Sequence, residues 1–489
     1  MKKRILFSHA YYLRFDPKQW ATRQPYPPLG TLYAAAFMRE NGFEIAFHDS
    51  MFSKTADEIE EAIHRFQPDF VVICDDGFNY LTKMCLTNMR EAAFRMIAIA
   101  KQQHCTVIVS SSDATDHFTD YLNKGADFVV LGEAEYSLLE LLSQYDAGVD
   151  CSAIRGLAFK TTNGILKTPA RPVSKELDAL PMPTWDLVNM TPYRKMWIES
   201  SGYFSLNVVT TRGCPYKCNW CAKPIYGNRY NTRSPEKVLA EIAFLKERFQ
   251  IDHIWFCDDI FGLKPGWVEN FAQLVQQSRI RFRFKIQARA DLLAQENYVQ
   301  WLAAAGCDNV WMGAESGSQR ILDAMDKGIS TQQIEVATGF LKKYRIKASF
   351  FLQFGYPGET RKDIRQTINM VNRLLPHSIG ISVSYPLPGT IFYERVKAEL
   401  ATKSNWTDSN ELALMFRNTY QPDFYRQLHR YVHLTHRLHL ALHQVHSIFR
   451  FRAKNGNRIL KKMVSLLYYF PALLLVKYKL EKLAKTTVS

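Results

Sequence analysis

Short apolar runs alternate with segments of helical periodicity through residues 1–145. Five runs are continuously apolar and rich in β-branched or aromatic residues, a pattern typical of strands buried on both faces; they span residues 4–7, 44–48, 70–74, 106–110 and 128–131. The patterns between them predict helices over residues 29–41, 56–66, 81–103 and 116–123. Alternating strands and helices predict a doubly wound parallel sheet.

Small and polar residues lie at the carboxyl ends of these predicted strands. They include Ser8, Asp75, Gly77, Ser110, Ser111, Gly132 and Glu133. Ligands of doubly wound sheets bind beyond the carboxyl ends of the strands. Small residues there would let a large flat ligand approach the backbone closely, whereas the lack of a G-x-G-x-x-G motif disfavours a dinucleotide.

A second alternation of strands and helices covers residues 201–395. Its predicted strands span residues 206–211, 253–256, 283–288, 309–312, 347–354 and 379–383. Between the two alternating regions, residues 146–200 form a predicted connector, in which Pro181 and Pro183 prevent a continuous helix. Residues 396–489 lose the strand pattern and predict a helical C-terminal extension.

Three cysteines stand close together directly after the first strand of the second region, as Cys214, Cys218 and Cys221. Iron–sulfur clusters are normally held by four Cys thiolates, so three leave one iron free for a small molecule. The alternative is a structural zinc site, which usually needs four protein ligands and often two C-x2-C pairs; no second pair is present. The other six cysteines are scattered and predict buried thiols in a reducing compartment.

The C-x3-C-x2-C spacing, with aromatic Trp220 before the last cysteine, resembles the signature of radical S-adenosylmethionine (SAM) enzymes. The resemblance implies a partial (β/α)6 barrel over residues 201–395 and a 4Fe–4S cluster whose open iron binds the amino and carboxylate groups of SAM. It also implies an electron donor such as flavodoxin or ferredoxin. The residues that would surround SAM are Trp220, Asp258, Asp259, Arg289 and Glu315.

A second resemblance concerns residues 1–145. The run from Pro27 to Gly30 and residues 126–135 are similar to the cobalamin-binding domain that precedes many radical SAM domains. The Asp-x-His-x-x-Gly motif of other cobalamin proteins is absent, which implies cobalamin without a histidine on the metal. The alternative is a degenerate flavodoxin-like domain that holds nothing.

Within this family the chain most resembles the anaerobic magnesium-protoporphyrin monomethyl ester oxidative cyclase and related methyltransferases, through residues 218–224 and the Gly-Tyr-Pro-Gly-Glu run that starts at Gly355. The resemblance implies a radical enzyme that acts on a C–H bond of a small apolar substrate, such as oxidative cyclisation of a tetrapyrrole. The alternatives are a cobalamin-dependent C- or P-methyltransferase, an RNA-modifying radical SAM enzyme and a non-catalytic, metal-bearing scaffold.

Charge is concentrated at the C-terminal end. The formal net charge is +15, and residues 430–489 contain twelve Lys or Arg and one acidic residue, Glu481. No recognisable RNA-binding module accompanies this charge, so no nucleic-acid partner is expected. The uncharged run 463–476 is shorter than the roughly 20 residues that span a bilayer. It predicts either a membrane-surface helix at the inner membrane face or a helix packed on the barrel.

Six histidines recur every three or four residues from His429 to His446, a spacing that places them along one helical face. A packed or solvated face is favoured over metal or porphyrin ligation. The basic N-terminus lacks the features of a signal peptide and predicts a first buried strand; with the reduced cysteines it predicts a cytoplasmic protein.

Overall fold

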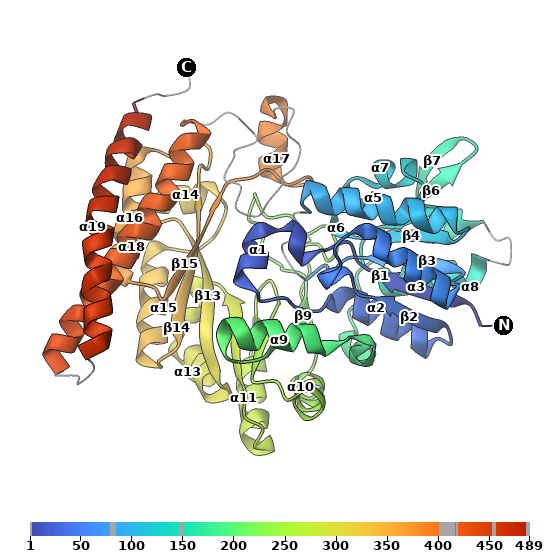
Figure 1. The fold of residues 1–489 in the computed structure, drawn as a ribbon, viewed down its shortest axis with the longest axis horizontal. Coiled ribbons are helices and arrows are strands. Elements are labelled where there is room, and N and C mark those ends of the chain that lie inside the picture. The colour runs from blue at the N-terminus through green and yellow to red at the C-terminus, as the bar shows by residue number, and fades with distance from the viewer. Residues whose placement is uncertain are drawn as a thin grey trace.

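The structure is a computed structural model that describes residues 2–78, 85–145, 150–400, 416, 419–451 and 456–485. Two sheets lie side by side, each covered by helices, and a pair of long helices stands at the end of the molecule farthest from the N-terminus (Figure 1). This confirms the predicted fold class, a doubly wound sheet followed by a six-stranded β/α domain and a helical C-terminal part.

The first sheet has the strand order β2-β1-β3-β4-β5-β6-β7. Its strands are β1 (Arg4–Ser8), β2 (Glu44–His48), β3 (Phe70–Cys74), β4 (Thr106–Ser110), β5 (Phe128–Val130), β6 (Leu157–Thr161) and β7 (Gly164–Lys167). The first five are parallel, and alternate residues of β3 enter the cores on opposite faces. The flanking helices are α2 (Leu29–Glu40), α3 (Ile59–Phe66), α5 (Thr87–Gln102), α6 (Ser112–Asp116), α7 (Phe118–Asn123) and α8 (Ala134–Gln144).

The segment expected to be a connector contains regular structure. Strands β6 and β7 form a hairpin that joins the first sheet antiparallel to β5. Asn163-Gly164 at the hairpin tip is the usual signal for a tight turn between two strands. After the hairpin, α9 (Met190–Ser201) leads into the second sheet. Of the predicted helix 81–103, residues 81–84 lie outside the described residues.

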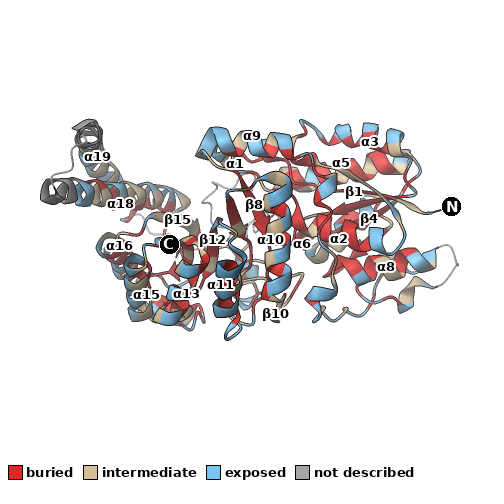
Figure 2. Cartoon of the chain, turned by 90° about the horizontal axis from the view of Figure 1, so that it is seen from below, coloured by how far each residue is buried: buried red, intermediate tan, exposed pale blue. Residues whose placement is uncertain are grey.

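The second sheet has the order β15-β14-β13-β12-β11-β8, and all its strands are parallel. The strands are β8 (Ser205–Val208), β11 (His253–Phe256), β12 (Arg283–Ala288), β13 (Cys307–Glu315), β14 (Lys347–Phe354) and β15 (Ser378–Val383). Helices α10 (Pro235–Phe249), α11 (Trp267–Ser278), α13 (Glu296–Ala305), α15 (Thr331–Lys343) and α16 (Arg361–Leu374) cover its outer face. Figure 2 shows that the buried residues follow the strands of both sheets and the helix sides packed on them.

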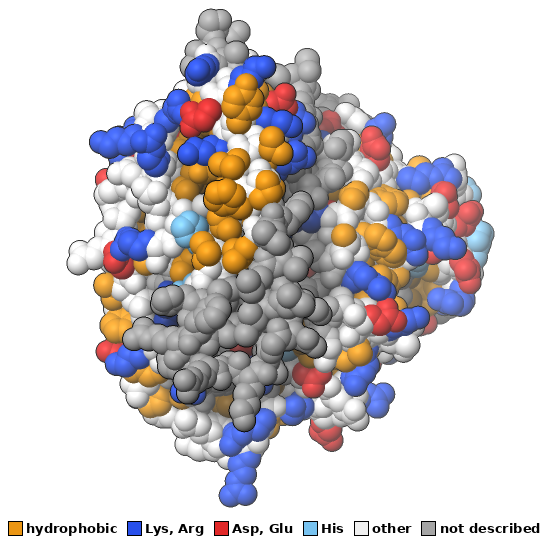
Figure 3. All heavy atoms as spheres, turned by 60° about the vertical axis from the view of Figure 1, so that its left-hand side comes forward, with side chains coloured by type: hydrophobic (Ala, Val, Ile, Leu, Met, Phe, Trp, Pro, Cys, Tyr) orange, Lys and Arg blue, Asp and Glu red, His pale blue; other side chains and the backbone are white. Residues whose placement is uncertain are grey.

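The C-terminal part is the helix pair α18 (Pro422–Phe451) and α19 (Gly456–Leu483), which pack against each other. Helix α18 lies on α16 and beside β15, the edge strand of the second sheet. On α19, exposed apolar side chains lie between Lys and Arg side chains (Figure 3). Among the described residues, no helix is both long enough and apolar enough to cross a membrane.

Candidate functional site

The loop that carries the three cysteines is held closed at both ends. It leaves the sheet after β8, and its ends pair as a two-stranded antiparallel ladder of β9 (Thr211–Arg212) and β10 (Asn231–Thr232). Gly213 follows β9 with φ +81°, and a Cβ atom there would lie 2.4 Å from the Arg229 carbonyl oxygen. Only glycine fits this turn, so the start of the loop is fixed by sterics.

The three thiols lie at the carboxyl end of the first strand of the second sheet. Cys214 is buried, and Cys218 and Cys221 are half-buried. Burial raises the pKa of the Cys214 thiol. Among the described residues, no three His, Cys, Asp or Glu side chains converge on the position of a single metal ion. Three thiols on one closed loop fit three corners of a cluster.

Asn219 holds the middle of this loop against the end of α14 (Gln319–Ala324) and against the residues that follow β14. Its backbone N–H donates to the Met325 carbonyl at 3.1 Å, and its side-chain amide donates to the Ala324 carbonyl and to Asp326, both at 2.8 Å. The Tyr356 hydroxyl, beyond the end of β14, donates to the Asn219 side-chain oxygen at 2.9 Å. The loop is therefore held from α14 and from β14.

Asp258 and Asp259 follow β11, but they have different surroundings. Asp258 is 1% exposed, and its oxygens accept four hydrogen bonds of 2.7–3.0 Å from the backbone N–H and hydroxyl groups of Thr210 and Thr211. These bonds end β8 at Val208, earlier than the predicted strand 206–211, and hold the chain where it enters the cysteine loop. Asp258 thus anchors protein backbone, while half-buried Asp259 lies beside it.

Arg289, after β12, contacts the cysteine loop through its aromatic residue. Its guanidinium lies 3.6 Å from the centroid of the Tyr216 ring, and it donates to Asp291 at 3.0 Å and to the Gly328 carbonyl at 3.2 Å. The guanidinium is buried and already paired with a carboxylate. Arg289 is therefore next to the loop, with part of its hydrogen-bonding capacity used by the protein.

Glu315, at the end of β13, is buried and accepts a 2.7 Å hydrogen bond from Lys327. Burial alone would lower the pKa of Lys327, but Glu315 and Cys218 outweigh it and raise that pKa. The Lys327 ammonium also lies 5.9 Å from the Trp220 ring. The buried Trp220 Nε1 has no hydrogen-bond partner among the described residues, so one donor beside the cysteines is open to a ligand.

Six of the seven residues predicted at the first sheet's edge line one hollow: Asp75, Gly77, Ser110, Ser111, Gly132 and Glu133. Sequence reasoning missed its other lining residues, which include Gly30, Ile225 and Tyr226. Ile225 and Tyr226 come from the cysteine loop, so the hollow lies between the two sheets. The glycine and serine residues within this lining fit the close approach of a flat macrocycle to the backbone.

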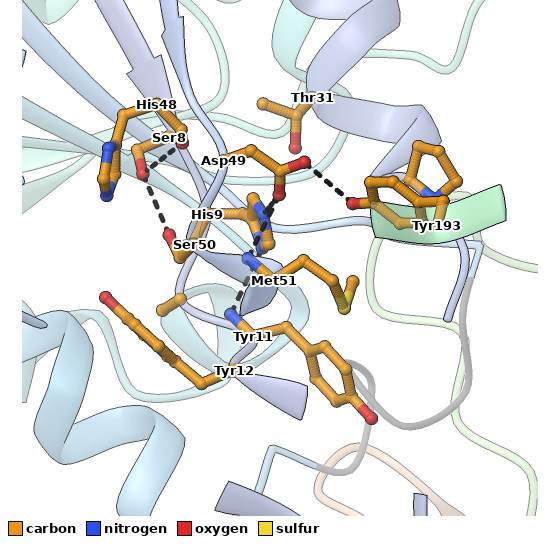
Figure 4. Close-up of polar contacts among 12 residues, drawn as sticks. Ser8, His9, Tyr11, Tyr12, Thr31, His48, Asp49, Ser50, Met51 and Tyr193 are labelled. Carbon is orange, nitrogen blue, oxygen red and sulfur yellow. Dashed lines mark hydrogen bonds and ion pairs between the residues drawn. The ribbon is translucent and has the colours of Figure 1, made fainter. Parts of the chain in front are cut away.

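The seventh residue, Ser8, does not line this hollow. It is fully buried, and its hydroxyl donates to the His48 carbonyl at 2.9 Å and lies 3.2 Å from the Ser50 hydroxyl (Figure 4). Neighbouring His9 is 1% exposed; its Nε2 lies 2.9 Å from Asp49 and its Nδ1 accepts from the Tyr11 N–H at 3.4 Å. Both ring nitrogens of His9 are therefore engaged by the protein.

A buried ion cluster joins the hollow to the cysteine loop. The Arg212 guanidinium, two residues before Cys214, donates to Glu133 at 2.9 Å and to Glu135 at 2.6 Å, and all three side chains are at most 5% exposed. Burial, with Glu135 nearby, raises the pKa of Glu133. Tyr33, Phe78 and Tyr226 surround the guanidinium.

Comparison with family descriptions assigns both regions. Residues 208–371 match the radical SAM superfamily, and residues 21–142 match the B12-binding domain. The protein is a radical SAM enzyme with a B12-binding domain. A radical SAM domain implies a 4Fe–4S cluster and SAM, and a B12-binding domain implies cobalamin, which confirms the predicted cofactors. The zinc-site and non-catalytic alternatives are thereby set aside.

Related proteins include enzymes with both predicted reaction types. This radical SAM enzyme is 29% identical to an uncharacterized methyltransferase of Pyrococcus horikoshii, over 78% of this chain and 81% of the relative. It is 24% identical to the anaerobic magnesium-protoporphyrin IX monomethyl ester cyclase of Rubrivivax gelatinosus, over 80% of this chain and 70% of the relative.

A solved structure supports the fold of nearly the whole chain. The cobalamin-dependent SAM radical enzyme OxsB, with aqua-cobalamin bound, aligns over 98% of this chain and 81% of its own, with a TM-score of 0.72 and 16% identity. This chain therefore shares its fold with that structure along nearly its whole length. At this identity the likeness concerns the fold alone.

Sequence reasoning missed several residues that hold the radical SAM site together. Lys327, Asn219 and Arg212 are 12, 107 and 79 residues away in the sequence from the groups they contact, so no local spacing indicates the pairing. Arg212 and Asn219 lie in the same short run as the three cysteines. A polar residue in this run could therefore have been predicted to hold the loop in place. Lys327 follows a short helix and has no such signal.

Proposed function

We propose that Cys214, Cys218 and Cys221 hold the 4Fe–4S cluster, and that SAM binds between this loop and the ends of β11 to β13. Such a cluster supplies the electron that cleaves SAM into methionine and a 5′-deoxyadenosyl radical. The free Trp220 Nε1 and the Glu315–Lys327 pair support this placement, because they leave a polar, ionic surface beside the thiols. Asp259 and Arg289 would complete the SAM site, and Asp258 would position the loop.

We propose that cobalamin binds at the hollow on the first sheet, in contact with the glycine and serine residues of its strand ends. The main support for the proposed function is that the cysteine loop forms part of the wall of this hollow. Ile225 and Tyr226 line the hollow, and Arg212 ties its Glu133 to the base of the same loop. A molecule held there would face the site of SAM cleavage. The engagement of His9 supports cobalamin without this histidine as a metal ligand.

We propose that the reaction replaces a C–H bond of an apolar small molecule, with methyl transfer to carbon as the first candidate. The relative in Pyrococcus horikoshii is named a methyltransferase, and a B12-binding domain suits methyl transfer. Oxidative cyclisation of a tetrapyrrole is the second candidate, favoured by the name of the Rubrivivax gelatinosus relative. Reductive SAM cleavage also needs a one-electron donor, for which flavodoxin or ferredoxin is proposed.

We further propose that α19 contacts an anionic membrane surface. The outward side of the helix presents apolar side chains that are 54–71% exposed, namely Phe470, Leu474, Leu475 and Tyr478. Exposed Lys477 and Lys479 are neighbours of these residues along the helix, and exposed Lys482 and Lys485 follow. An apolar stripe bordered by lysines is the pattern of helices that lie in a membrane interface. The other side of α19 packs through Leu480, Leu483 and Ala484.

The test of the proposed function is anaerobic purification with cobalamin supplied, followed by iron and cobalt analysis and product assays. Alanine at Cys214, Cys218 or Cys221 should each remove iron and abolish 5′-deoxyadenosine formation, because each thiol is one of only three proposed ligands. Cys151→Ala is the matched control, since Cys151 is a half-buried thiol outside the loop, and it should retain both.

The products also separate the two candidate reactions. Methyl transfer consumes SAM as a methyl donor as well, so S-adenosylhomocysteine should accumulate together with 5′-deoxyadenosine. Cyclisation alone yields 5′-deoxyadenosine without S-adenosylhomocysteine. Full iron content and full SAM cleavage in any of the three loop variants would refute the proposed cluster ligands.

A further inference from the structure

The two faces of the second sheet differ in how completely they are covered. Residues on the helix-covered face, such as Ile254, Phe284 and Val310, are 0% exposed. In-register residues of parallel strands point to the same face, and Trp255, Lys285 and Asn309 stand in register on the other, inner face. These three, with Trp311 and Phe351 further along, are only half-buried. The inner face therefore keeps surface that the protein itself does not cover.

Aromatic rings form a flat surface on this inner face. The Trp311 and Phe351 rings stack with centroids 4.7 Å apart and an interplanar angle of 23°. Gly380 of β15 lies against this stack, and a Cβ atom there would come within 3.2 Å of Trp311 and 3.3 Å of Phe351. The missing side chain makes room for the two rings. Aromatic faces of this kind stack well on flat, apolar molecules.

Polar groups on the same face lack partners. Gln353 is 1% exposed, yet neither its amide oxygen nor its amide nitrogen has a hydrogen-bond partner among the described residues. Ser384 is 0% exposed, and its hydroxyl likewise has no partner in the described part of the chain. Leaving a buried polar group unpaired costs about 1–3 kcal/mol, so such groups usually have a function. Here they would bind a ligand.

Lys285 is a charged group of this face, and unlike Lys347 and Arg289 it forms no ion pair with a carboxylate of the described residues. Its ammonium lies 5.3 Å from the Tyr26 ring, 5.4 Å from the Trp255 ring and 5.9 Å from the Trp197 ring. No carboxylate or other hydrogen-bond acceptor of the described residues pairs with it. Burial lowers the pKa of Lys285 to about 8. Asp308 acts on the ammonium at longer range and opposes this shift. The cation is therefore held among aromatic rings without a carboxylate in hydrogen-bond contact in the described part of the chain.

Lys285 is too far from the cysteine loop to serve SAM. Arg289, which contacts that loop, follows Lys285 by four residues along the direction of β12. At about 3.3 Å per residue, the backbone positions of Lys285 and Arg289 are roughly 13 Å apart. The carboxylate of SAM belongs at the cluster. The group that reaches Lys285 must therefore belong to another molecule, one long enough to extend from the radical site along the inner face.

We propose that the inner face of the second sheet binds a flat, largely apolar substrate that carries a carboxylate, with the aromatic surface under its rings and Lys285 paired with its carboxylate. This inference rests on the proposed function, and it names the class of substrate for the same site. Gln353 and Ser384 would hydrogen-bond to polar atoms of the substrate nearer the cluster.

The test uses the full-length protein and two probes that differ only in charge, protoporphyrin IX and its dimethyl ester, with binding followed by porphyrin fluorescence. The wild type should bind the acid at least about tenfold more tightly than the ester, the range expected for one charge-assisted hydrogen bond. Lys285→Met should abolish this preference by weakening the acid alone, and Lys285→Arg should retain it. Trp311→Ala should weaken both probes equally.

Two variants serve as controls. Lys347→Met removes a lysine from the same sheet that is exposed and paired with Asp308, and Phe244→Ala removes an exposed ring on α10; neither should change binding. Circular dichroism would show that each variant is folded. Equal binding of acid and ester by the wild type, no binding of either, or an unchanged preference in Lys285→Met would overturn the inference. Formation of 5′-deoxyadenosine by the same preparation shows separately whether the proposed function stands.

Discussion

At the scale of single residues, hydrogen-bond partners decide what a strand-end carboxylate can do. Asp258 and Asp259 are adjacent in the sequence, and the sequence predicts that both lie beside SAM. The structure separates them, because Asp258 accepts four hydrogen bonds from Thr210 and Thr211. A carboxylate used in this way holds backbone in place, and its loss leaves several donors unpaired.

We therefore expect Asp258→Ala to reduce the iron bound after anaerobic reconstitution, because the chain entering the cysteine loop loses its anchor. Asp259→Ala is the adjacent control and should keep full iron content while weakening SAM binding. Iron analysis and SAM equilibrium dialysis on the same samples distinguish the two effects. If Asp258→Ala instead keeps its iron and loses only SAM affinity, Asp258 contacts SAM directly.

The positions of the cysteines and of Glu315 could be predicted, because each follows a strand and has a chemically distinctive side chain. Their partners could not, since the Glu315–Lys327 pair and the bonds of Asn219 depend on how separate elements pack. Ser8 shows the same limit. Its place at the end of β1 is as expected, but its hydroxyl turns to His48 and Ser50, and no sequence pattern indicates that direction.

At the scale of elements, strands buried on both faces were the most predictable feature. Runs 70–74, 106–110, 253–256 and 347–354 coincide with observed strands, because a continuous apolar run of that length suits a parallel strand under helices. The β6–β7 hairpin was missed because it is exposed on one side and carries Lys and Thr residues. A half-exposed edge hairpin lacks the apolar signal.

The histidines of α18 illustrate an element whose pattern was ambiguous from sequence. His436 is buried, and its Nε2 lies 2.8 Å from the Pro376 carbonyl, where it packs on the barrel. Burial, assisted by nearby cations such as Arg437, lowers the pKa of His429 to about 4 and that of His433 to about 3. These observations support a packed helix face; His446 lies outside the residues whose side chains are described.

These lowered pKa values predict acid sensitivity of α18. Unfolded His takes up a proton near pH 6.5, whereas folded His429 and His433 resist protonation until about pH 4 and 3, so stability is lost as pH falls below about 6.5. The free energy of unfolding, measured with urea, should decrease between pH 7 and pH 5 in the wild type. When both histidines are replaced by Leu, this decrease should be smaller by about 1 kcal/mol or more. His443→Leu, at an exposed position of the same helix, should leave the slope unchanged. An identical slope in the double variant would show that these side chains protonate freely.

At the scale of the whole molecule, the two sheets are joined by one buried ion cluster. Arg212→Met should destabilise the protein by about 3–5 kcal/mol, because Glu133 and Glu135 would stay buried without their cation. The loss should grow as pH rises from about 5 to 8, since burial raises the pKa of Glu133 and folding then requires a protonated carboxyl. Urea unfolding across this pH range measures both effects.

A matched control for this prediction is Arg23→Met. Arg23 pairs with Glu199 at 2.6 Å and also links the first domain to α9, but both side chains are more than 40% exposed. An exposed pair contributes about 0–1 kcal/mol, so this variant should be nearly neutral at every pH. A neutral Arg212→Met would mean that solvent reaches the cluster and that it does not hold the sheets together.

The proposed membrane contact concerns the end of the molecule farthest from the B12-binding domain. Leu474→Glu with Leu475→Glu should abolish sedimentation with vesicles that contain phosphatidylglycerol, because two charges would enter the apolar stripe of α19. Each of Lys477→Gln and Lys479→Gln should weaken binding about fivefold, equivalent to about 1 kcal/mol per charge, and added salt should weaken the wild type.

The controls are Ile391→Glu, at another exposed apolar residue, and Lys237→Gln on α10; neither lies on α19, and neither should change vesicle binding. Helix α19 packs along α18, and Leu480 and Leu483 pack against the hydrophobic core, so a charged outward face should not detach it from the barrel. Iron content equal to that of the wild type would verify this. If the doubly charged variant instead changes from dimer to monomer in analytical ultracentrifugation, while the wild type ignores vesicles, the apolar stripe is a self-association surface and the membrane proposal fails.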